Sequence, residues 1–360
     1  MNVRTTSVLR RPRRGRRRTV QAVAVAAAAL VAGCSASATA DPVGPTGGGG
    51  ASGTPTTLLD RPVNAVAGCP VFAPDSVWHS RVETLPVDSR SAGWIAHLGG
   101  ISANVRANIG SVLWQGSRPG LPVNVVDSSK VPMQTMTFSG EYGPAASYNG
   151  PYPVFDGMRV EGDPGVAWDQ HVLLVDTKDC SAYELFLYQP WARSIGRWYA
   201  TNGARWSLSD GTRPGPSVNA AGTPHIAGVP RLEEVRAGRV DHLLHACSSL
   251  VASDFTWPAR ASDGAGRPGV APPMGARLRL RAGVDPASFP GQAGVLARAM
   301  REHGVLLNDS CHLPLVITAD NPGAGWNDAE VATLNRLTLA DFEFVDQGPL
   351  RISELSWRTR

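Results

Sequence analysis

The sequence lacks the motifs that most directly identify a reaction. It has no G-x-S-x-G nucleophile elbow, no H-E-x-x-H zinc helix, no Walker loop and no dinucleotide-binding fingerprint. It also lacks C-x-x-C pairs, which a cysteine-based zinc site would need. Its N-terminal apolar run, Val20 to Ala32, is shorter than the roughly 20 residues that span a membrane. These absences disfavour the commonest enzyme classes and an ordinary transmembrane anchor.

The N-terminus has the order of a lipoprotein export signal. An arginine-rich segment, residues 10–18, precedes the apolar run, and Val31-Ala32-Gly33-Cys34 follows it. We therefore predict a signal peptide over residues 1–33 and lipidation of Cys34, which would hold the mature chain outside the cytoplasm on a membrane. Twin-arginine export remains an alternative route. Residues 34–68 would form a linker, since residues 35–57 are almost entirely Ser, Ala, Gly, Thr and Pro.

Removal of the signal changes the charge balance. Eight of the 34 basic residues precede Cys34 and none of the 30 acidic ones does, which leaves 26 basic against 30 acidic residues, or about −4. No cluster of basic residues with interleaved aromatics remains. We expect no nucleic-acid partner.

Four of the five cysteines follow Cys34, at positions 69, 180, 247 and 311. An even number in an oxidising compartment favours two disulfides, although three pairings are open.

Residues 69–348 are expected to form a single mainly β domain, a sandwich or jelly roll with a few short helices, followed by a C-terminal tail, residues 349–360. Two closely joined halves are the alternative. Residues 171–188 suggest a hairpin, residues 276–281 a strand with one wet, arginine-bearing face, and residues 342–345 another strand. Helices are expected around residues 295–303, ended by Gly304, and over residues 328–337, capped by Asn327 with Glu330 in a capping box.

Candidate catalytic residues begin with Asp169 and His171, which would share one face of a strand. Glu184 lies on the expected partner strand, and Asp309 lies where an apolar run meets a polar turn. Carboxylates near a histidine suit glycoside or ester hydrolysis, in which one group donates a proton and another activates water. Ordinary outward-facing or turn-forming roles are the alternative for each.

His242 and His245 form H-x-x-H, but the apolar residues between and after them favour a buried strand, which would point the two rings to opposite faces. We therefore expect neither a metal nor another cofactor. His225 follows Pro224 on a loop and has no evident partner.

Several of the ten tryptophans gather in residues 168–206. Indole and phenol rings stack on the apolar faces of sugars, so a cleft lined by Trp191, Trp198 and Tyr199 would suit a polysaccharide. Core packing explains any single one of them equally well.

Residues 168–346 carry an ordered series of short segments. They are Trp168-Asp169-Gln170-His171 to Asp176, Tyr183-Glu184-Leu185, Asn219-Ala220-Ala221-Gly222 with Pro224, residues 231–235, residues 238–242, Pro272 to Arg277, His303-Gly304 with Asp309, and Phe342 to Asp346. In this order the chain resembles a family of exported bacterial β-rich proteins. The resemblance implies a polar site near His171, His242 and Asp309 and supplies no reaction. The chain departs from the pattern at Asn219, where the family carries an acid, and after Asp309, where the family has a glycine-containing turn.

These observations lead us to expect a lipid-anchored protein that acts on a glycan or cell-envelope polymer, with glycoside hydrolysis through paired carboxylates as the leading reaction. Asp169, Glu184 and Asp309 would act as acid, base or nucleophile. His171 and His242 would orient or polarise, and Arg277 would bind a substrate oxygen. The alternatives are a non-catalytic surface lipoprotein that binds carbohydrate or protein, and a purely structural one.

Overall fold

The computed structural model describes residues 64–165, 168–210 and 215–360. The expected signal peptide, Cys34 and most of the expected linker lie outside the described residues. Within the described part of the chain, no helix has the length and apolarity that crossing a bilayer requires.

The largest sheet has six strands in the order β16-β13-β14-β12-β15-β3. Their bounds are β3 (Arg106–Asn108), β12 (Leu244–Cys247), β13 (Arg277–Leu280), β14 (Val305–Asp309), β15 (Val316–Thr318) and β16 (Phe342–Val345). The central strands β12 and β14 run parallel and the pairs β12–β15, β13–β14 and β13–β16 run antiparallel, while the edge strand β3 is parallel to β15. Because β12 and β14 are parallel, their carboxyl ends open at the same edge.

A second sheet has four strands in the order β11-β9-β8-β5. They are β5 (Val123–Val126), β8 (Val172–Asp176), β9 (Ser181–Phe186) and β11 (Asn202–Ser207). The antiparallel pair β8–β9 confirms the hairpin expected over residues 171–188. Both hairpin strands are almost entirely buried, which explains their apolar composition.

Three two-stranded pairs complete the β structure. They are β1 (Ala65–Val66) with β2 (Cys69–Pro70), β4 (Ser117–Arg118) with β7 (Gly162–Pro164), and β6 (Met136–Phe138) with β10 (Trp198–Ala200). The α-helices are α1 (Ser91–His97), α2 (Leu232–Arg236), α3 (Gly291–Glu302) and α4 (Asp328–Ala332). Short 3-10 helices are η1 (Pro144–Ala146), η2 (Pro190–Ile195), η3 (His225–Ala227), η4 (Pro286–Ser288), η5 (Thr333–Arg336), η6 (Leu339–Asp341) and η7 (Gly348–Leu350). The mainly β fold with short helices is thus confirmed.

Both predicted helices are present. The first, α3, ends before Gly304, whose φ of +74° is the left-handed conformation expected of a C-terminal stop. The second begins as predicted, since the Asn327 side chain accepts a hydrogen bond from the Glu330 amide, but it is α-helical only to Ala332 and continues as η5. The Glu330 carboxylate accepts a hydrogen bond from the backbone amide of Gln292, and this contact links α4 to α3.

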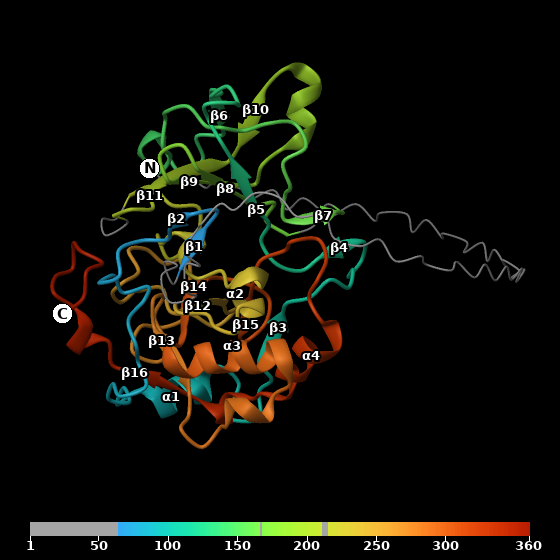
Figure 1. The fold of residues 1–360 in the computed structure, drawn as a ribbon. Coiled ribbons are helices and arrows are strands. Elements are labelled where there is room, and N and C mark those ends of the chain that lie inside the picture. Colours follow the sequence, from blue (N-terminus) through green and yellow to red (C-terminus); the bar gives the residue numbers. More distant parts are fainter. Residues whose placement is uncertain (1–63, 166–167, 211–214) are drawn as a thin grey trace, which may run out of the picture. The chain divides into compact units, whose positions relative to one another are not determined.

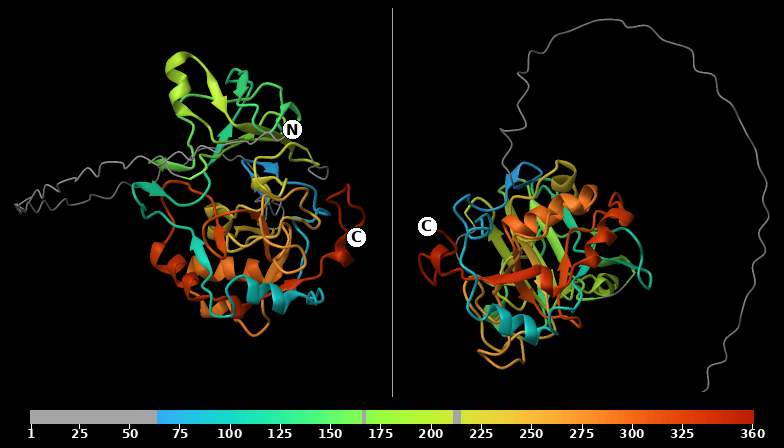
Figure 2. Two further views of the ribbon diagram at one scale, coloured as in Figure 1. Left: turned by 180° about the vertical axis from the view of Figure 1, so that it is seen from behind. Right: turned by 90° about the horizontal axis from the view of Figure 1, so that it is seen from below.

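The core is layered around the two larger sheets. Leu173 and Val175 of β8 share one apolar cluster with Leu306 of β14 and Leu243 just before β12, so this cluster joins the two sheets. On the other side of the six-stranded sheet, side chains of α1, α2, α3 and α4 form a separate cluster with its strands. Figures 1 and 2 show α1 and α3 on the side of this sheet that faces away from β8 and β9.

The arginines of β13 correct a sequence expectation. Arg277 and Arg279 are buried, at 0 % and 9 % exposure, so only Arg281 fits the predicted wet face. Arg277 donates to the His303 carbonyl at 2.7 Å, to the Ser80 carbonyl at 2.8 Å and to the Ser80 hydroxyl at 3.0 Å. Burial lowers its pKa to about 9. An arginine enclosed by main-chain carbonyls is structural, and it cannot reach a substrate as we predicted.

Two disulfides connect the fold, as the cysteine count predicted. They join Cys69 to Cys180 and Cys247 to Cys311, which selects one of the three open pairings. Disulfides of this kind are typical of proteins outside the cytoplasm. The C-terminal residues also belong to the folded unit, because Trp357 is fully buried with its ring centroid 5.0 Å from that of Trp78.

Candidate active site and metal centre

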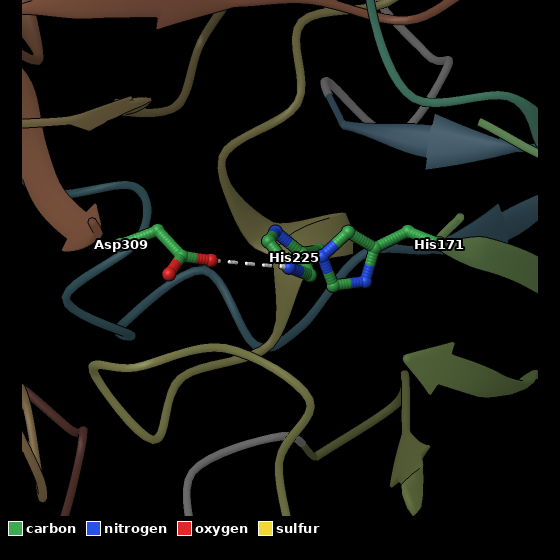
Figure 3. A group of neighbouring side chains, drawn as sticks. All are labelled: His171, His225 and Asp309. Atoms are coloured by element: carbon green, nitrogen blue, oxygen red, sulfur yellow. Dashed lines mark ion pairs between the residues drawn. The ribbon is translucent and has the colours of Figure 1, made fainter. Parts of the chain in front are cut away.

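Three side chains from distant parts of the chain meet at the boundary of the two larger sheets. His171 directly precedes β8, His225 is the first residue of η3, and Asp309 is the last residue of β14. Each offers one ligand atom, and these atoms all lie within 4.8 Å of one another. Figure 3 shows the His225 ring between Asp309 and His171. Both histidines are buried, whereas the Asp309 side chain is 22 % exposed, so the group opens to solvent on the Asp309 side.

The alternation of β8 and β9 places His171 on the face of the hairpin that meets the other sheet. Its Nδ1 lies 3.3 Å from the Leu185 carbonyl oxygen, which can only accept, so Nδ1 carries the proton and Nε2 keeps a lone pair. Burial lowers the pKa of His171 to about 4, although the nearby Asp169 charge acts in the opposite direction. The ring is therefore neutral at physiological pH and its Nε2 is available as a ligand.

His225 is neutral as well, because burial holds its pKa well below the usual range. Its Nε2 is buried, has no hydrogen-bond partner among the described residues, and lies 3.9 Å from Asp309 Oδ2. Its Nδ1 is 3.5 Å from the Asn308 side-chain amide. The ring contacts that of His171 edge to face, with centroids 4.5 Å apart. A buried nitrogen without a hydrogen-bond partner lowers the stability of the fold. The Nε2 of His225 faces the Asp309 carboxylate and the His171 imidazole.

Carboxyl groups crowd the same place. Burial, together with the Asp169 charge, raises the pKa of Asp309 to about 8. Burial and the same Asp169 charge raise the pKa of Glu161 to about 8. The Glu161 carboxylate accepts from the His171 amide at 3.2 Å, and its own amide donates to the His171 carbonyl at 2.8 Å. A cation at this position would offset the mutual repulsion of these carboxylates.

Glu184 lies next to the site and holds one of its elements in place. It is fully buried on β9, and its Oε1 accepts from the Ile226 amide at 3.0 Å, which fixes η3 next to the hairpin. Burial raises its pKa to about 7. Its contact with η3 positions His225 rather than placing the carboxylate among the three ligand atoms.

Asp169 reaches the site in a way that differs from our prediction. It lies in a turn before β8, not on a strand face beside His171, and the residues on either side of it, Trp168 and Gln170, have φ values of +61° and +48°. The Asp169 carbonyl accepts from the Leu187 amide at 2.9 Å, which ties the turn to the end of β9. The exposed Asp169 side chain nevertheless acts electrostatically on His171, Glu161 and Asp309.

Two imidazoles and a carboxylate with one side open to solvent suit a catalytic zinc ion. Two ligands bonded tetrahedrally to zinc at about 2.0–2.1 Å lie about 3.4 Å apart, somewhat closer than the 3.9 Å between His225 Nε2 and Asp309 Oδ2. The hydrogen bond from His171 Nδ1 to a carbonyl is the outer-shell contact that orients a ligating histidine. The same donor set also suits ferrous iron, but an oxidising compartment favours a redox-inert ion.

His242 belongs to a different polar cluster. It is fully buried, and its Nε2 lies 3.2 Å from Glu234, which also pairs with the buried Arg231. The structure thus brings together Asp169, His171 and Asp309, with Glu184 adjoining, and does not place His242 among their ligand atoms. Asp320 lies near this second cluster and accepts from the Leu232 amide at 3.1 Å.

Asp320 makes the stability of the fold depend on pH. Burial raises its pKa to about 7, above the value near 3.9 of an unfolded chain, so between these values the native state holds a proton that the unfolded state lacks. The protonated Asp320 contributes fully to stability below the unfolded pKa near 3.9. This contribution is lost as the pH rises from there to the native pKa of about 7. We expect the stability of Asp320→Asn relative to the wild type to rise by about 2–3 kcal/mol between pH 5 and pH 8, since the wild type loses about 1.4 kcal/mol per pH unit over this range up to pH 7. Thermal unfolding at both pH values measures this, and an equal difference at pH 5 and pH 8 would contradict it.

The expected aromatic cleft is only partly accessible. Trp191 is 59 % exposed, and its ring is 6.3 Å from that of Tyr199, tilted by 36°. Trp198 is buried, and the Arg193 guanidinium covers its ring at 3.7 Å, although the residue is among those that line a cavity of about 730 Å³. The covered Trp198 face is not free to stack on a sugar.

The sequence reasoning missed His225 and Glu161. His225 lies on a short Gly- and Pro-flanked loop, and its partners are about 50 residues before it and over 80 after it. No local pattern marks such a residue. Only the packing of η3 between the hairpin and β14 places it beside them.

Comparison with known proteins adds no assignment. The chain matches no protein-family model, no curated protein and no solved structure. The fold and the site define a β-rich, disulfide-linked protein with a histidine–carboxylate centre, and inference about its function rests on that centre.

Proposed function

We propose that the protein is an exported, zinc-dependent hydrolase that acts on a glycan, with His171, His225 and Asp309 as the metal ligands. The observation that carries the proposal is the convergence of three ligand atoms within 4.8 Å, one of them the unpaired buried Nε2 of His225. This departs from our sequence expectation of no metal, which considered zinc motifs and the pair His242 and His245 but not this group of residues.

When bound, zinc would polarise a carbonyl oxygen and make a nearby water more acidic. The protein groups divide the remaining work. His171 and His225 stay neutral and hold their positions, and the exposed Asp169 carboxylate can take the proton from the attacking water. The water oxygen joins the carbonyl carbon, the bond from that carbon to the sugar oxygen breaks, and Asp169 returns the proton to the departing oxygen. The reaction that fits best is therefore removal of an acyl group from a sugar.

Glycoside hydrolysis is the second candidate, favoured by the crowding of Glu161, Asp169 and Asp309. It needs one protonated and one ionised carboxyl group across the scissile bond, and no metal. The two reactions release different products, since the first yields a small carboxylic acid and the second shorter sugars.

Metal removal separates these candidates. We expect the chelator-treated protein to lose more than about 90 % of its acyl-releasing activity on acetylated xylan or peptidoglycan and to recover it with one equivalent of zinc, because the ion supplies the polarising charge. Release of acetate before and after chelation is the measurement. Activity that survives complete chelation, with shorter sugars as product, would favour the carboxylate mechanism and exclude the zinc proposal.

Membrane attachment is part of the proposal. The N-terminal order of arginines, apolar run and Val31-Ala32-Gly33-Cys34 supports a lipid on Cys34, and the two disulfides fit the same compartment. Labelled palmitate should enter the wild type and not Cys34→Ser, and labelling of neither would contradict it.

A further inference from the structure

A pair of exposed tryptophans stands beside the candidate metal centre. The rings of Trp114 and Trp168 lie nearly parallel, at an interplanar angle of 18°, with centroids 6.2 Å apart. They remain 56 % and 37 % exposed even though they contact each other. Trp114 comes from the loop before β4 and Trp168 from the turn before β8, so two separate segments build one aromatic surface.

The chain holds this surface close to the site. Trp168 precedes His171 by three residues, which limits their Cα separation to about 11 Å. Asp169, between them, acts electrostatically on all three of His171, Glu161 and Asp309. The backbone of Trp168 is therefore held near the residue that supplies one of the ligand atoms.

The turn that carries Trp168 is strained. A bulky residue at a φ of +61° is an outlier, and Gln170 at +48° is a second one in the same turn. Such conformations are energetically unfavourable and persist only where the surroundings enforce them, as they do at many binding sites. Here the amides of Leu187 and Tyr188 donate to the carbonyls of Asp169 and Gln170 and hold the turn in place.

We propose that Trp114 and Trp168 form the glycan-binding platform that presents a sugar residue to the His171–His225–Asp309 centre. This inference rests on the proposed function and names the part of the protein that binds the substrate. Exposed indole rings next to a carboxylate in the sequence match the alternating apolar faces and hydroxyl edges of a polysaccharide. Val112 and Leu113 are also exposed beside Trp114, and a lipid surface is the competing occupant that the experiment must separate. The glycan is favoured because Trp168 is bordered by polar Asp169 and Gln170 and adjoins the centre.

The test uses the full chain with Cys34→Ser, so that no attached lipid contributes to binding. Retention on insoluble peptidoglycan and insoluble xylan is compared with partition onto phosphatidylglycerol vesicles. Trp114→Ala and Trp168→Ala are expected to weaken glycan retention about 5- to 100-fold, the range found for loss of one aromatic stacking partner. Phe255→Ala is the control, an exposed aromatic residue outside the platform, and should bind like the parent chain.

Zinc titration of the metal-free variants separates this inference from the proposed function. If Trp114→Ala and Trp168→Ala bind zinc like the parent and lose the glycan, the platform is supported. If His225→Ala loses zinc while the chain keeps its tryptophan-dependent glycan retention, the platform still holds and the zinc proposal fails. The inference is overturned if the parent is retained on neither polymer, if both platform variants bind glycan normally, or if they lose vesicle binding instead.

Discussion

Replacing His225 with alanine is expected to weaken zinc binding by more than about 100-fold, beyond the loss that removal of an outer-shell partner causes. The buried Nε2 of His225 has no partner in the described structure other than the two groups that would share the ion, so the substitution removes a ligand and breaks no hydrogen bond of that nitrogen. His171→Ala should have the same effect. The measurement is calorimetric titration of zinc into the metal-free protein.

His312→Ala is the matched control for this prediction. His312 is exposed and lies three residues beyond Asp309, so it tests whether any histidine near the site contributes. It should bind zinc like the wild type. Equal affinities for His225→Ala, His312→Ala and the wild type would show that the ion, if bound, is held elsewhere.

Removal of the Cys247–Cys311 disulfide is expected to lower both stability and zinc affinity. The crosslink closes a loop of sequence separation 64, so its loss from the double variant Cys247→Ser/Cys311→Ser should cost about 4 kcal/mol of unfolding free energy. Cys247 pairs with Asp309 in the register of β12 and β14, and Cys311 follows Asp309 by two residues. Freed of the crosslink, the end of β14 should hold Asp309 less firmly, and we expect zinc affinity to fall about 10-fold.

The second disulfide provides the comparison. Cys69→Ser/Cys180→Ser opens a loop of sequence separation 111 and should cost about 4–5 kcal/mol, but Cys180 follows β8 at the end opposite His171. Denaturant unfolding and zinc titration of both double variants measure the two effects. If both variants lose zinc affinity equally, the effect of Cys247–Cys311 is general destabilisation and not the positioning of Asp309.

Local sequence patterns predicted those parts of the fold whose causes are local. The hairpin of β8 and β9, the Asn327 cap and the stop at Gly304 follow from apolar runs, a capping side chain and a glycine with positive φ, and each is present. The same kind of pattern gave a wrong prediction for the arginines of β13, which we expected on a solvent-exposed face. Their alternation is typical of a half-wet strand, but main-chain carbonyls from residues 77–85 satisfy their donors inside the protein.

The site was predictable only in part, because its residues come together through tertiary packing. Asp169, His171 and Asp309 stood out as polar residues next to buried strands, and they do converge. His225 did not, since nothing near it in the sequence points to His171 or Asp309. His242 was misleading for a related reason: a buried histidine next to an apolar run looks the same whether it faces a ligand or, as here, a structural carboxylate on Glu234.

Anomalous scattering from a crystal of the zinc-loaded protein, recorded on both sides of the zinc absorption edge, tests the central claim most directly. The account predicts one strong peak within about 2.0–2.2 Å of His171 Nε2, His225 Nε2 and an Asp309 carboxylate oxygen. A fully loaded crystal with no peak between these three side chains, or with its peak beside His242 and Glu234, would contradict it.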